Sequence, residues 1–397
     1  MLTDSLRAGF KGRRAVLRAA TLLFSVCVAL LLGELLLRVL IPKADEYYVR
    51  PPHMKRTFRP MPSVMPGVVG ESRFLTNSIG LRGDELTREF GYRILAVGGS
   101  TTECLYLDQD EAWPQLLQAK LNEGRSGRRA WVGNAGLSGL NSRDHVVQLK
   151  YLLKQHDDVD AVVLLVGVND LASRLKQDES YDPNFMSRAE AEPALLARSF
   201  KVAPDPALPF YKKTALWRLL RDAKAAVIRA WDDEGETQDA AGVAYVRWRE
   251  HRRDAPSIRQ TLPNLKPALE EYARNLNTII DLARARHARL ILMTQPTLWR
   301  RDMTPELSGL LWMGGVGNFQ KEAGMEYYST DALADGMALY NETLLKVCRE
   351  RGVECLDLAA LIPKDTTAFY DDCHFNEGGA RLVAEAIAGH LKATPPR

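Results

Sequence analysis

The sequence predicts a three-layer α/β/α domain with a five-stranded parallel sheet, preceded by one helix long enough to cross a membrane. Short apolar runs alternate with amphipathic helical segments after residue 90, which is typical of a parallel sheet with helices on both faces. Polar residues follow the ends of several apolar runs, where α/β sheets bind their ligands. An apolar stretch near the N-terminus predicts the additional helix.

The first 41 residues consist of a basic tail, residues 1–18, and an apolar stretch, residues 19–41. The stretch has only Glu34 and Arg38 as charged residues, and about 20 residues suffice to span the hydrocarbon core. No cleavage site of small residues follows it, so we expect an uncleaved transmembrane signal anchor in the cytoplasmic (inner) membrane. A buried amphipathic helix is the alternative, although the first part of the stretch has no charged face.

The charges around this stretch favour a cytoplasmic tail and a large domain outside the membrane. Every charged residue of the tail except Asp4 is basic. The count of basic residues is nearly balanced by those that follow the span, so the orientation depends on the composition of the tail. These basic residues after the span are Lys43, Arg50, Lys55, Arg56 and Arg59.

Residues 42–90 are rich in proline and polar residues, and we expect an extended stalk that docks onto the domain at 91–397. The predicted strands are Arg93–Val97, Arg129–Gly133, Ala161–Val166, Arg289–Thr294 and Val353–Asp357. The predicted helices are Trp113–Glu123, Arg143–Lys154, Leu265–Arg286, Ala332–Arg351 and about Glu377 to Leu391, the last with Asn376 as its cap.

An insertion at about residues 172–264 is too long for a plain connection between strands and is typical of a lid or a partner surface. It contains a helical stretch, an acidic turn and a basic run. The basic run, Arg247 to Arg253, is interpreted as a solvated face, and no site is assigned to it. The glycine-rich loop at residues 310–317 either borders the pocket or packs on the core as a tight turn.

The composition excludes some classes of partner. The formal net charge is only +3, so no global field attracts nucleic acid. The seven histidines are scattered without metal-binding spacing, and we expect neither a metal nor a cofactor. None of the five cysteines forms a CxxC pair; Cys104 and Cys373 flank the two catalytic segments, and free thiols are the favoured state for any pair.

Two segments supply a nucleophile and its activating groups. Gly98-Gly99-Ser100 follows the first apolar strand, and Asp371 precedes His374 by three residues near the C-terminus. A serine hydroxyl needs a histidine to take its proton and a third group to fix the tautomer of the imidazole. The order Ser, Asp, His therefore predicts ester chemistry on Ser100, with Asp372 as the competing candidate for the orienting acid.

Two further segments can stabilise an oxyanion. Residues 134–139 follow the second strand and end in Gly139, and residues 167–170 follow the third and contain Asn169. A backbone N–H of glycine, the side-chain amide of Asn169 and the N–H of the nucleophile supply three donors, each worth ~3 kcal/mol of barrier. Gly136 is the alternative donor to Gly139.

Each segment alone has a simpler explanation. The turn at Gly98 could hold a phosphate, but it lacks the lysine of a P-loop and the third glycine of a dinucleotide-binding turn. Thr102 stands where the nucleophile elbow of α/β-hydrolases requires glycine. Asn169 could be a turn residue and Asp371 a helix cap. Four segments in this order at strand ends make coincidence improbable.

Together these segments resemble the conserved blocks of the SGNH (GDSL-like) hydrolase family, over residues 93–391 apart from the insertion. The resemblance implies a flavodoxin-like domain in which Ser100 is the nucleophile, His374 the general base and acid, and Asp371 the residue that orients His374. It also implies that Gly139 and Asn169 complete the oxyanion hole. One departure is Gly99, where the namesake block of the family has aspartate.

The sequence therefore predicts a membrane-anchored serine esterase or O-deacylase that acts on an acylated carbohydrate or lipid outside the cytoplasmic membrane. An O-acyltransferase that modifies a cell-surface polysaccharide is the first alternative, because the same acyl-enzyme could pass its acyl group to a sugar hydroxyl. An inert glycan-binding module and a cytoplasmic thioesterase are the remaining alternatives. The sequence predicts no nucleic-acid partner.

Overall fold

The computed structural model describes residues 2–40, 47–124, 127, 129–204, 209–231 and 236–394. The chain divides into two compact units. The smaller consists of Met1–Asp45 and Pro204–Asp233, and the larger of Glu46–Ala203 and Glu234–Arg397.

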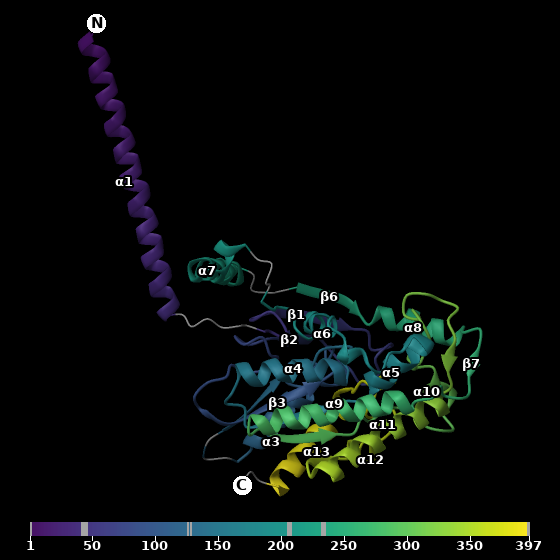
Figure 1. The fold of residues 1–397 in the computed structure, drawn as a ribbon. Coiled ribbons are helices and arrows are strands. Elements are labelled where there is room, and N and C mark those ends of the chain that lie inside the picture. The colour runs from purple at the N-terminus through teal and green to yellow at the C-terminus, as the bar shows by residue number, and fades with distance from the viewer. Residues whose placement is uncertain are drawn as a thin grey trace. The chain divides into compact units, whose positions relative to one another are not determined.

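The larger unit is built on a five-stranded sheet with the strand order β10-β8-β5-β3-β4 (Figure 1). All neighbouring strands are parallel, which confirms the predicted fold class. Each strand overlaps a predicted one, and the central strand β5 is buried along its whole length because all five of its residues are apolar. The strands are β3 (Phe90–Gly98), β4 (Arg129–Asn134), β5 (Ala161–Leu165), β8 (Arg289–Met293) and β10 (Glu354–Leu356).

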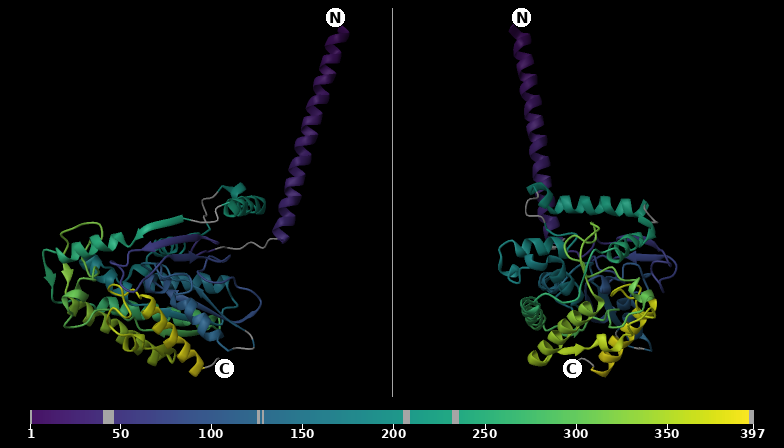
Figure 2. Two further views of the ribbon diagram at one scale, coloured as in Figure 1. Left: turned by 180° about the vertical axis from the view of Figure 1, so that it is seen from behind. Right: turned by 90° about the vertical axis from the view of Figure 1, so that its right-hand side faces the viewer.

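Helices cover both faces of this sheet. On one face α9 (Lys266–Ala285) packs between α4 (Ser142–Gln155) and α11 (Thr330–Arg351). On the other, α3 (Trp113–Asn122) packs against α13 (Glu377–Ala393), the yellow C-terminal helix in Figure 2. This division follows from right-handed crossovers, because the chain moves across the sheet in one direction from β3 to β4 and in the other from β4 through β5 and β8 to β10. Asn376 caps α13 as predicted, because its side chain accepts a hydrogen bond from the N–H of Gly379.

The segment predicted to be a stalk contains two strands, β1 (Lys55–Pro60) and β2 (Ser72–Leu75), which pair antiparallel. The strand β6 (Glu236–Ala241) comes from the insertion and pairs parallel with β1, which gives a second sheet with the order β2-β1-β6. Apolar residues of the same segment, among them Met65 and Leu81, are buried in the main core. Residues 47–90 are therefore an integral part of the larger unit.

The remaining elements connect this framework. Strands β7 (Ile258–Arg259) and β9 (Tyr327–Tyr328) form a short parallel pair. The other elements of the larger unit are α2 (Ser100–Glu103), α5 (Val168–Gln177), η1 (Asp178–Ser180), η2 (Phe185–Ser187), α6 (Ala191–Ser199), α8 (Val243–Arg253), α10 (Pro305–Ser308) and α12 (Leu358–Leu361).

The smaller unit contains α1 (Leu2–Leu40), η3 (Phe210–Lys213) and α7 (Ala215–Trp231). Within the described residues, one segment has the length and composition of a membrane span: Leu17–Leu40 of α1, with a mean hydropathy of 2.3 and no burial. A signal sequence has the same properties. The helical stretch predicted inside the insertion corresponds to α7.

Two cysteines form a disulfide, Cys348 at the end of α11 and Cys355 in β10, with their Cα atoms 6.2 Å apart. The preference for free thiols in every pair is therefore wrong here. It failed because α11 ends at Arg351 and the chain reverses at Gly352, which brings two cysteines seven residues apart in the sequence face to face. Cys104 and Cys373 are free and buried.

Candidate active site

The candidate nucleophile lies at the junction between β3 and α2. The strand ends at Gly98 and the short helix begins at Ser100, so the serine stands at the carboxyl end of a parallel strand. This turn is tightly packed, because a Cβ atom on Gly98 would lie 2.2 Å from Oγ1 of Thr102. As the first residue of the helix, Ser100 has a backbone N–H without an intrahelical acceptor.

A continuous hydrogen-bonded chain connects Ser100, His374 and Asp371. Oγ of Ser100 lies 2.7 Å from Nε2 of His374, and Nδ1 of His374 lies 2.7 Å from Oδ2 of Asp371. Asp371 is fully buried and also accepts hydrogen bonds from the backbone N–H groups of Cys373 and His374. The indole N–H of Trp312 donates to Oδ2 of Asp371 at 2.9 Å. The structure thus brings the three predicted residues together and holds the carboxylate in one orientation.

The competing acid, Asp372, faces another way. Its carboxylate accepts a hydrogen bond from Nε1 of Trp299 at 2.8 Å and from the backbone N–H groups of Trp312 and Met313. The residue beside the imidazole of His374 is therefore Asp371. The glycine-rich loop of residues 310–317 borders the site, because Trp312 contacts both acids.

The electrostatics within this hydrogen-bonded chain of side chains favour an ion pair between Asp371 and His374. Burial alone would raise the pKa of Asp371, but the charge and hydrogen bonds of His374 and the indole of Trp312 lower it below its ordinary value. Burial alone would lower the pKa of His374, but the charge of Asp371 raises it well above 6.5. Burial and the charge of Asp371 raise the pKa of Asp372 to about 6.

A thiol, that of Cys373, adjoins His374. Asp371, Cys373 and His374 offer potential metal-ligand atoms within 4.8 Å of one another. Both ring nitrogens of His374 are already engaged, Nδ1 by Asp371 and Nε2 by Ser100. Burial raises the pKa of Cys373 to about 11, so this sulfur stays protonated and is a poor ligand. These contacts fit a catalytic triad better than a metal site.

Two aromatic rings enclose the imidazole. The ring of Tyr370 is stacked on that of His374 at 5.5 Å, and the ring of Tyr245 meets it edge-on at 6.3 Å. Tyr245 belongs to α8, which comes from the insertion. The insertion therefore contributes a wall of the site, which sequence reasoning missed because nothing local to α8 indicates contact with a residue 129 positions away.

The basic run at residues 247–253 only partly fits its interpretation as a solvated face. Arg253 is exposed and pairs with Asp254. In contrast, Arg249 donates to the backbone carbonyls of Leu310 and Tyr370, and Arg252 donates to those of Met313 and Tyr328. These two guanidinium groups attach α8 to the loops that carry Trp312 and Asp371.

The candidate oxyanion donors come from the ends of β4 and β5. Gly139 has φ +80°, a conformation that favours glycine, and its N–H makes no hydrogen bond to any of the described residues. Gly136, the alternative donor, gives its N–H to Oδ1 of Asn134 at 2.9 Å, and a Cβ on it would lie 2.3 Å from the backbone N of Glu103. These contacts favour Gly139.

Asn169 lies directly beside the residue that precedes the nucleophile. Its Nδ2 donates one hydrogen to the carbonyl of Leu140 at 2.8 Å, which leaves the other for a ligand. A Cβ atom on Gly99 would lie 2.4 Å from this nitrogen. The glycine at position 99 is thus the residue type that lets the amide of Asn169 approach Ser100.

A buried acid supports the loop that carries Gly139. Glu103, in the last position of α2, accepts hydrogen bonds from the backbone N–H and the hydroxyl of Ser138 and is paired with Arg50. On the other side of the loop, Arg198 donates to the carbonyl of Gly139 at 3.1 Å. Sequence reasoning missed Glu103. Its position three residues after the candidate nucleophile was the available signal, and a buried acid is unusual there.

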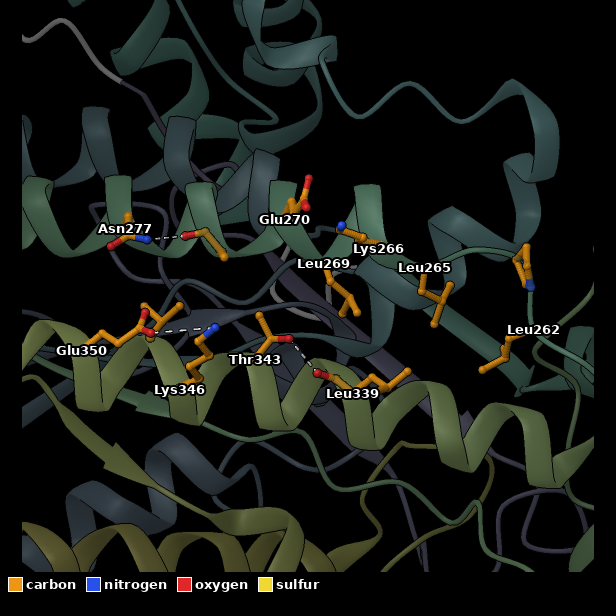
Figure 3. Close-up of a pocket in the computed structure, with 13 residues that line it drawn as sticks. Leu262, Leu265, Lys266, Leu269, Glu270, Asn277, Leu339, Thr343, Lys346 and Glu350 are labelled. Carbon is orange, nitrogen blue, oxygen red and sulfur yellow. Dashed lines mark hydrogen bonds and ion pairs between the residues drawn. The ribbon is translucent and has the colours of Figure 1, made fainter.

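A separate groove lies between α9 and α11 (Figure 3). Its volume is about 430 Å³, and Figure 3 shows Lys266 and Leu269 on one wall opposite Leu339 and Lys346 on the other. None of the residues described above for the triad or the oxyanion donors lines it. The catalytic chemistry and this groove are therefore distinct features.

Comparison with known proteins identifies the family of the chain. The model of the GDSL-like lipase/acylhydrolase family matches residues 96–382. No curated protein matches the chain significantly.

Solved structures resemble the chain only distantly. They include an alpha/beta hydrolase from the metagenome of Lake Arreo, Spain, with 15% identity over 77% of this chain and 98% of that chain and a TM-score of 0.40. The aryl esterase of M. smegmatis has 12% identity over 76% and 99%, with a TM-score of 0.40. A catalytic mutant of an acetylxylan esterase from Geobacillus stearothermophilus has 14% identity over 78% and 96%, with a TM-score of 0.41. Likeness at this level carries no inference about substrate.

Proposed function

The chain belongs to the GDSL-like lipase/acylhydrolase family and is a hydrolase, and from this premise we propose that it is a serine esterase or O-deacylase with Ser100 as its nucleophile. Its substrate would be an acylated carbohydrate or lipid outside the cytoplasmic membrane. The observation that supports this mechanism is the hydrogen-bonded chain from Ser100 through His374 to Asp371. The two ring nitrogens of His374 each lie 2.7 Å from an oxygen of the neighbouring residue.

Acylation begins when Oγ of Ser100 attacks the carbonyl carbon of the ester, while Nε2 of His374 takes the hydroxyl proton. The electron pair of the carbonyl moves to oxygen, and the N–H groups of Ser100 and Gly139 and the amide of Asn169 donate to that oxyanion. Asp371 stabilises the imidazolium that forms and fixes its orientation. The intermediate then expels the alcohol, which receives its proton from His374, and leaves an acyl group on Ser100.

Deacylation repeats these steps with water. His374, neutral again, takes a proton from a water molecule, whose oxygen attacks the acyl carbon and forms a second oxyanion in the same site. Collapse of this intermediate releases the carboxylic acid and returns the proton to Oγ of Ser100. The site is then ready for another turnover, and no further group needs to be consumed.

Two features support a location outside the cytoplasm. The apolar stretch Leu17–Leu40 has the composition of a membrane anchor and follows a basic tail. The disulfide between Cys348 and Cys355 belongs to an oxidising compartment, since cytosolic thiols are kept reduced. We therefore propose an uncleaved anchor, with the basic tail inside and the hydrolase domain on the outer, periplasmic side of the membrane.

The proposal is tested on the full chain in detergent micelles. Wild-type protein should hydrolyse p-nitrophenyl acetate or butyrate and react covalently with a fluorophosphonate probe, and Ser100→Ala should lose both properties. Ser187→Ala is the matched control, because Ser187 is exposed and its hydroxyl contacts only the carbonyl of Asn184. Hydrolysis that survives in Ser100→Ala would contradict the proposal.

The same experiment separates the acyltransferase alternative. A fluorophosphonate that labels Ser100 in a protein unable to hydrolyse either ester would indicate that the serine is activated but that water does not hydrolyse its acyl-enzyme. Labelling and turnover should then be measured again with a sugar alcohol as acceptor. Absence of labelling in the wild-type protein would contradict both versions, because each requires the activated nucleophile.

A further inference from the structure

The helix α7 presents an apolar stripe that its own unit leaves uncovered. Apolar residues recur every three or four positions from Leu216 to Val227, which places them on one side of the helix. Leu220 and Val227 on this side are each 59% exposed. A helix of a water-soluble domain normally buries such a stripe, so this one requires an apolar environment that the described residues of its own unit do not supply.

Aromatic side chains gather where α7 begins. Phe210 is 84% exposed, and its ring lies 6.0 Å from that of Tyr211, which in turn lies 5.7 Å from that of Trp217. The ammonium group of Lys212 lies 6.0 Å from the ring of Trp217. Tyrosine, tryptophan and lysine side chains are enriched together at the boundary between lipid and water.

The charges of this segment are almost all of one sign. Between residues 212 and 229 there are six basic residues and one acidic residue, Asp222. The basic residues are Lys212, Lys213, Arg218, Arg221, Lys224 and Arg229. Anionic lipid headgroups attract such a segment electrostatically.

A carboxylate of α1 fixes the start of α7. Oε1 of Glu34 accepts the backbone N–H of Ala215 at 2.9 Å, and Oε2 accepts that of Leu216 at 3.0 Å. These are two of the N–H groups at the start of a helix that have no intrahelical partner. Glu34 lies six positions before Leu40, the end of the apolar stretch, which corresponds to about 9 Å along the helix axis. The start of α7 is therefore held at the level where the span leaves the hydrocarbon.

We propose that α7 lies in the plane of the membrane surface, with its apolar stripe among the acyl chains and its basic side chains on anionic headgroups. The occupant of the stripe is the bilayer in which α1 is embedded, because Glu34 connects the two helices and the charge of the segment complements anionic lipid. This inference rests on the membrane location of α1 that is part of the proposed function, but it does not depend on the catalytic mechanism. It also assigns Glu34, a charged residue inside an apolar stretch, a role as the cap of a helix at the interface.

The test places an environment-sensitive fluorophore at single cysteines in the full chain. Cys27 is replaced by serine, and Leu220→Cys, Arg221→Cys and Leu30→Cys are each reconstituted in vesicles of about three parts phosphatidylcholine to one part phosphatidylglycerol. Some vesicles also contain lipids with a nitroxide quencher on the acyl chain. Leu220 reports the apolar stripe, Arg221 the polar side of the same helix, and Leu30 the middle of the span.

The proposal expects quenching by the nitroxide lipid at Leu220→Cys that is at least about twofold stronger than at Arg221→Cys. Omitting phosphatidylglycerol should weaken the quenching at Leu220→Cys. Circular dichroism and the unfolding midpoint of each variant show that the chain is folded, and each variant should match the wild type in both.

Each other outcome has a defined meaning. Quenching at Leu30→Cys without quenching at Leu220→Cys would overturn the proposal while α1 remained a span. A fluorophore at Leu220→Cys that is shielded from water but not quenched by the lipid would mean that protein covers the stripe, which also overturns it. Absence of quenching at Leu30→Cys would refute the membrane anchor itself, and with it the premise. Ester hydrolysis is measured separately, so that none of these results is confused with a failure of the catalytic proposal.

Discussion

Glu103 accepts two hydrogen bonds from Ser138, one from the backbone N–H at 2.9 Å and one from the hydroxyl. Glu103 ends the short helix that begins at Ser100, and Ser138 immediately precedes Gly139. This pair therefore connects the helix of the proposed nucleophile with the loop of the proposed oxyanion donor.

Replacing this acid should reduce catalysis through the position of the loop. In Glu103→Gln, one acceptor oxygen and the negative charge are lost, so the loop around Gly139 is held less firmly. We expect kcat to fall roughly tenfold with little change in KM, because small displacements of catalytic groups mainly affect the transition state. Steady-state kinetics with p-nitrophenyl butyrate give both constants.

The same substitution should also destabilise the protein. It leaves the half-buried guanidinium of Arg50 without its partner, which costs about 3 kcal/mol in comparable buried pairs. Adding Arg50→Met should recover much of the stability in denaturant unfolding but not the lost kcat. If the double variant recovered both, the role of Glu103 would be purely structural.

The activity should depend on the protonation of His374. The charge of Asp371 raises the pKa of His374 well above 6.5, and the general base works only when it is neutral. We therefore expect kcat/KM to rise with pH through a midpoint above 6.5. Asp371→Asn removes the negative charge that raises the pKa of His374, so the midpoint should shift to lower pH. At the same time kcat should fall by roughly 10³–10⁴-fold. A midpoint that does not move in Asp371→Asn would contradict the assignment of Asp371.

Trp312 and Trp299 offer a matched pair of substitutions. The indole of Trp312 donates to Asp371 at 2.9 Å, and that of Trp299 donates to Asp372 at 2.8 Å. Both Trp→Phe variants should lose stability by about 2 kcal/mol, because each removes a hydrogen bond to a buried carboxylate. Only Trp312→Phe should also lower kcat, by roughly tenfold, since Asp372 does not contact His374. Equal loss of kcat in both variants would argue against a specific role of the indole of Trp312.

Gly99→Ala should disable the amide of Asn169. The added Cβ would lie 2.4 Å from Nδ2 of Asn169, so the amide must move. The φ of Gly99 is −82°, so alanine does not need a left-handed backbone at this position, and the effect should come from the added Cβ. Loss of one oxyanion donor predicts a fall in kcat of roughly 10²–10³-fold.

A double-mutant cycle checks the cause of that fall. In an Asn169→Ala background the amide is already absent, so adding Gly99→Ala should cost almost nothing further. Full additivity of the two effects would mean that Gly99→Ala acts by another route than the amide.

The sequence allowed the main sheet and the family to be predicted because their signals are local. The strand at Ala161–Leu165 consists entirely of apolar residues, and the matching family model confirms the family predicted from the four segments. The positions of Ser100, Asp371 and His374 follow from strand ends and from spacing. Their roles remain predictions until the variants are measured.

Other features could not be predicted because they depend on contacts between distant residues. β1 contains three basic residues and pairs with β6, 180 positions later, so neither strand has a recognisable pattern of its own. The contacts of Trp312 with Asp371 and of Tyr245 with His374 likewise join loops that only the folded chain brings together. Arg249 and Arg252 resemble surface residues in the sequence and bind backbone carbonyls in the structure.

The separation of Ser100 and His374 by 274 positions also sets when activity can begin. The ribosome adds roughly 5–20 residues per second, so the histidine is made tens of seconds after the serine. Until then Ser100 lacks the histidine proposed to be its base. The sheet of β1 likewise stays incomplete until β6 has been synthesised. On the proposed mechanism, a nascent chain therefore cannot cleave esters before His374 has been synthesised, 274 residues after Ser100.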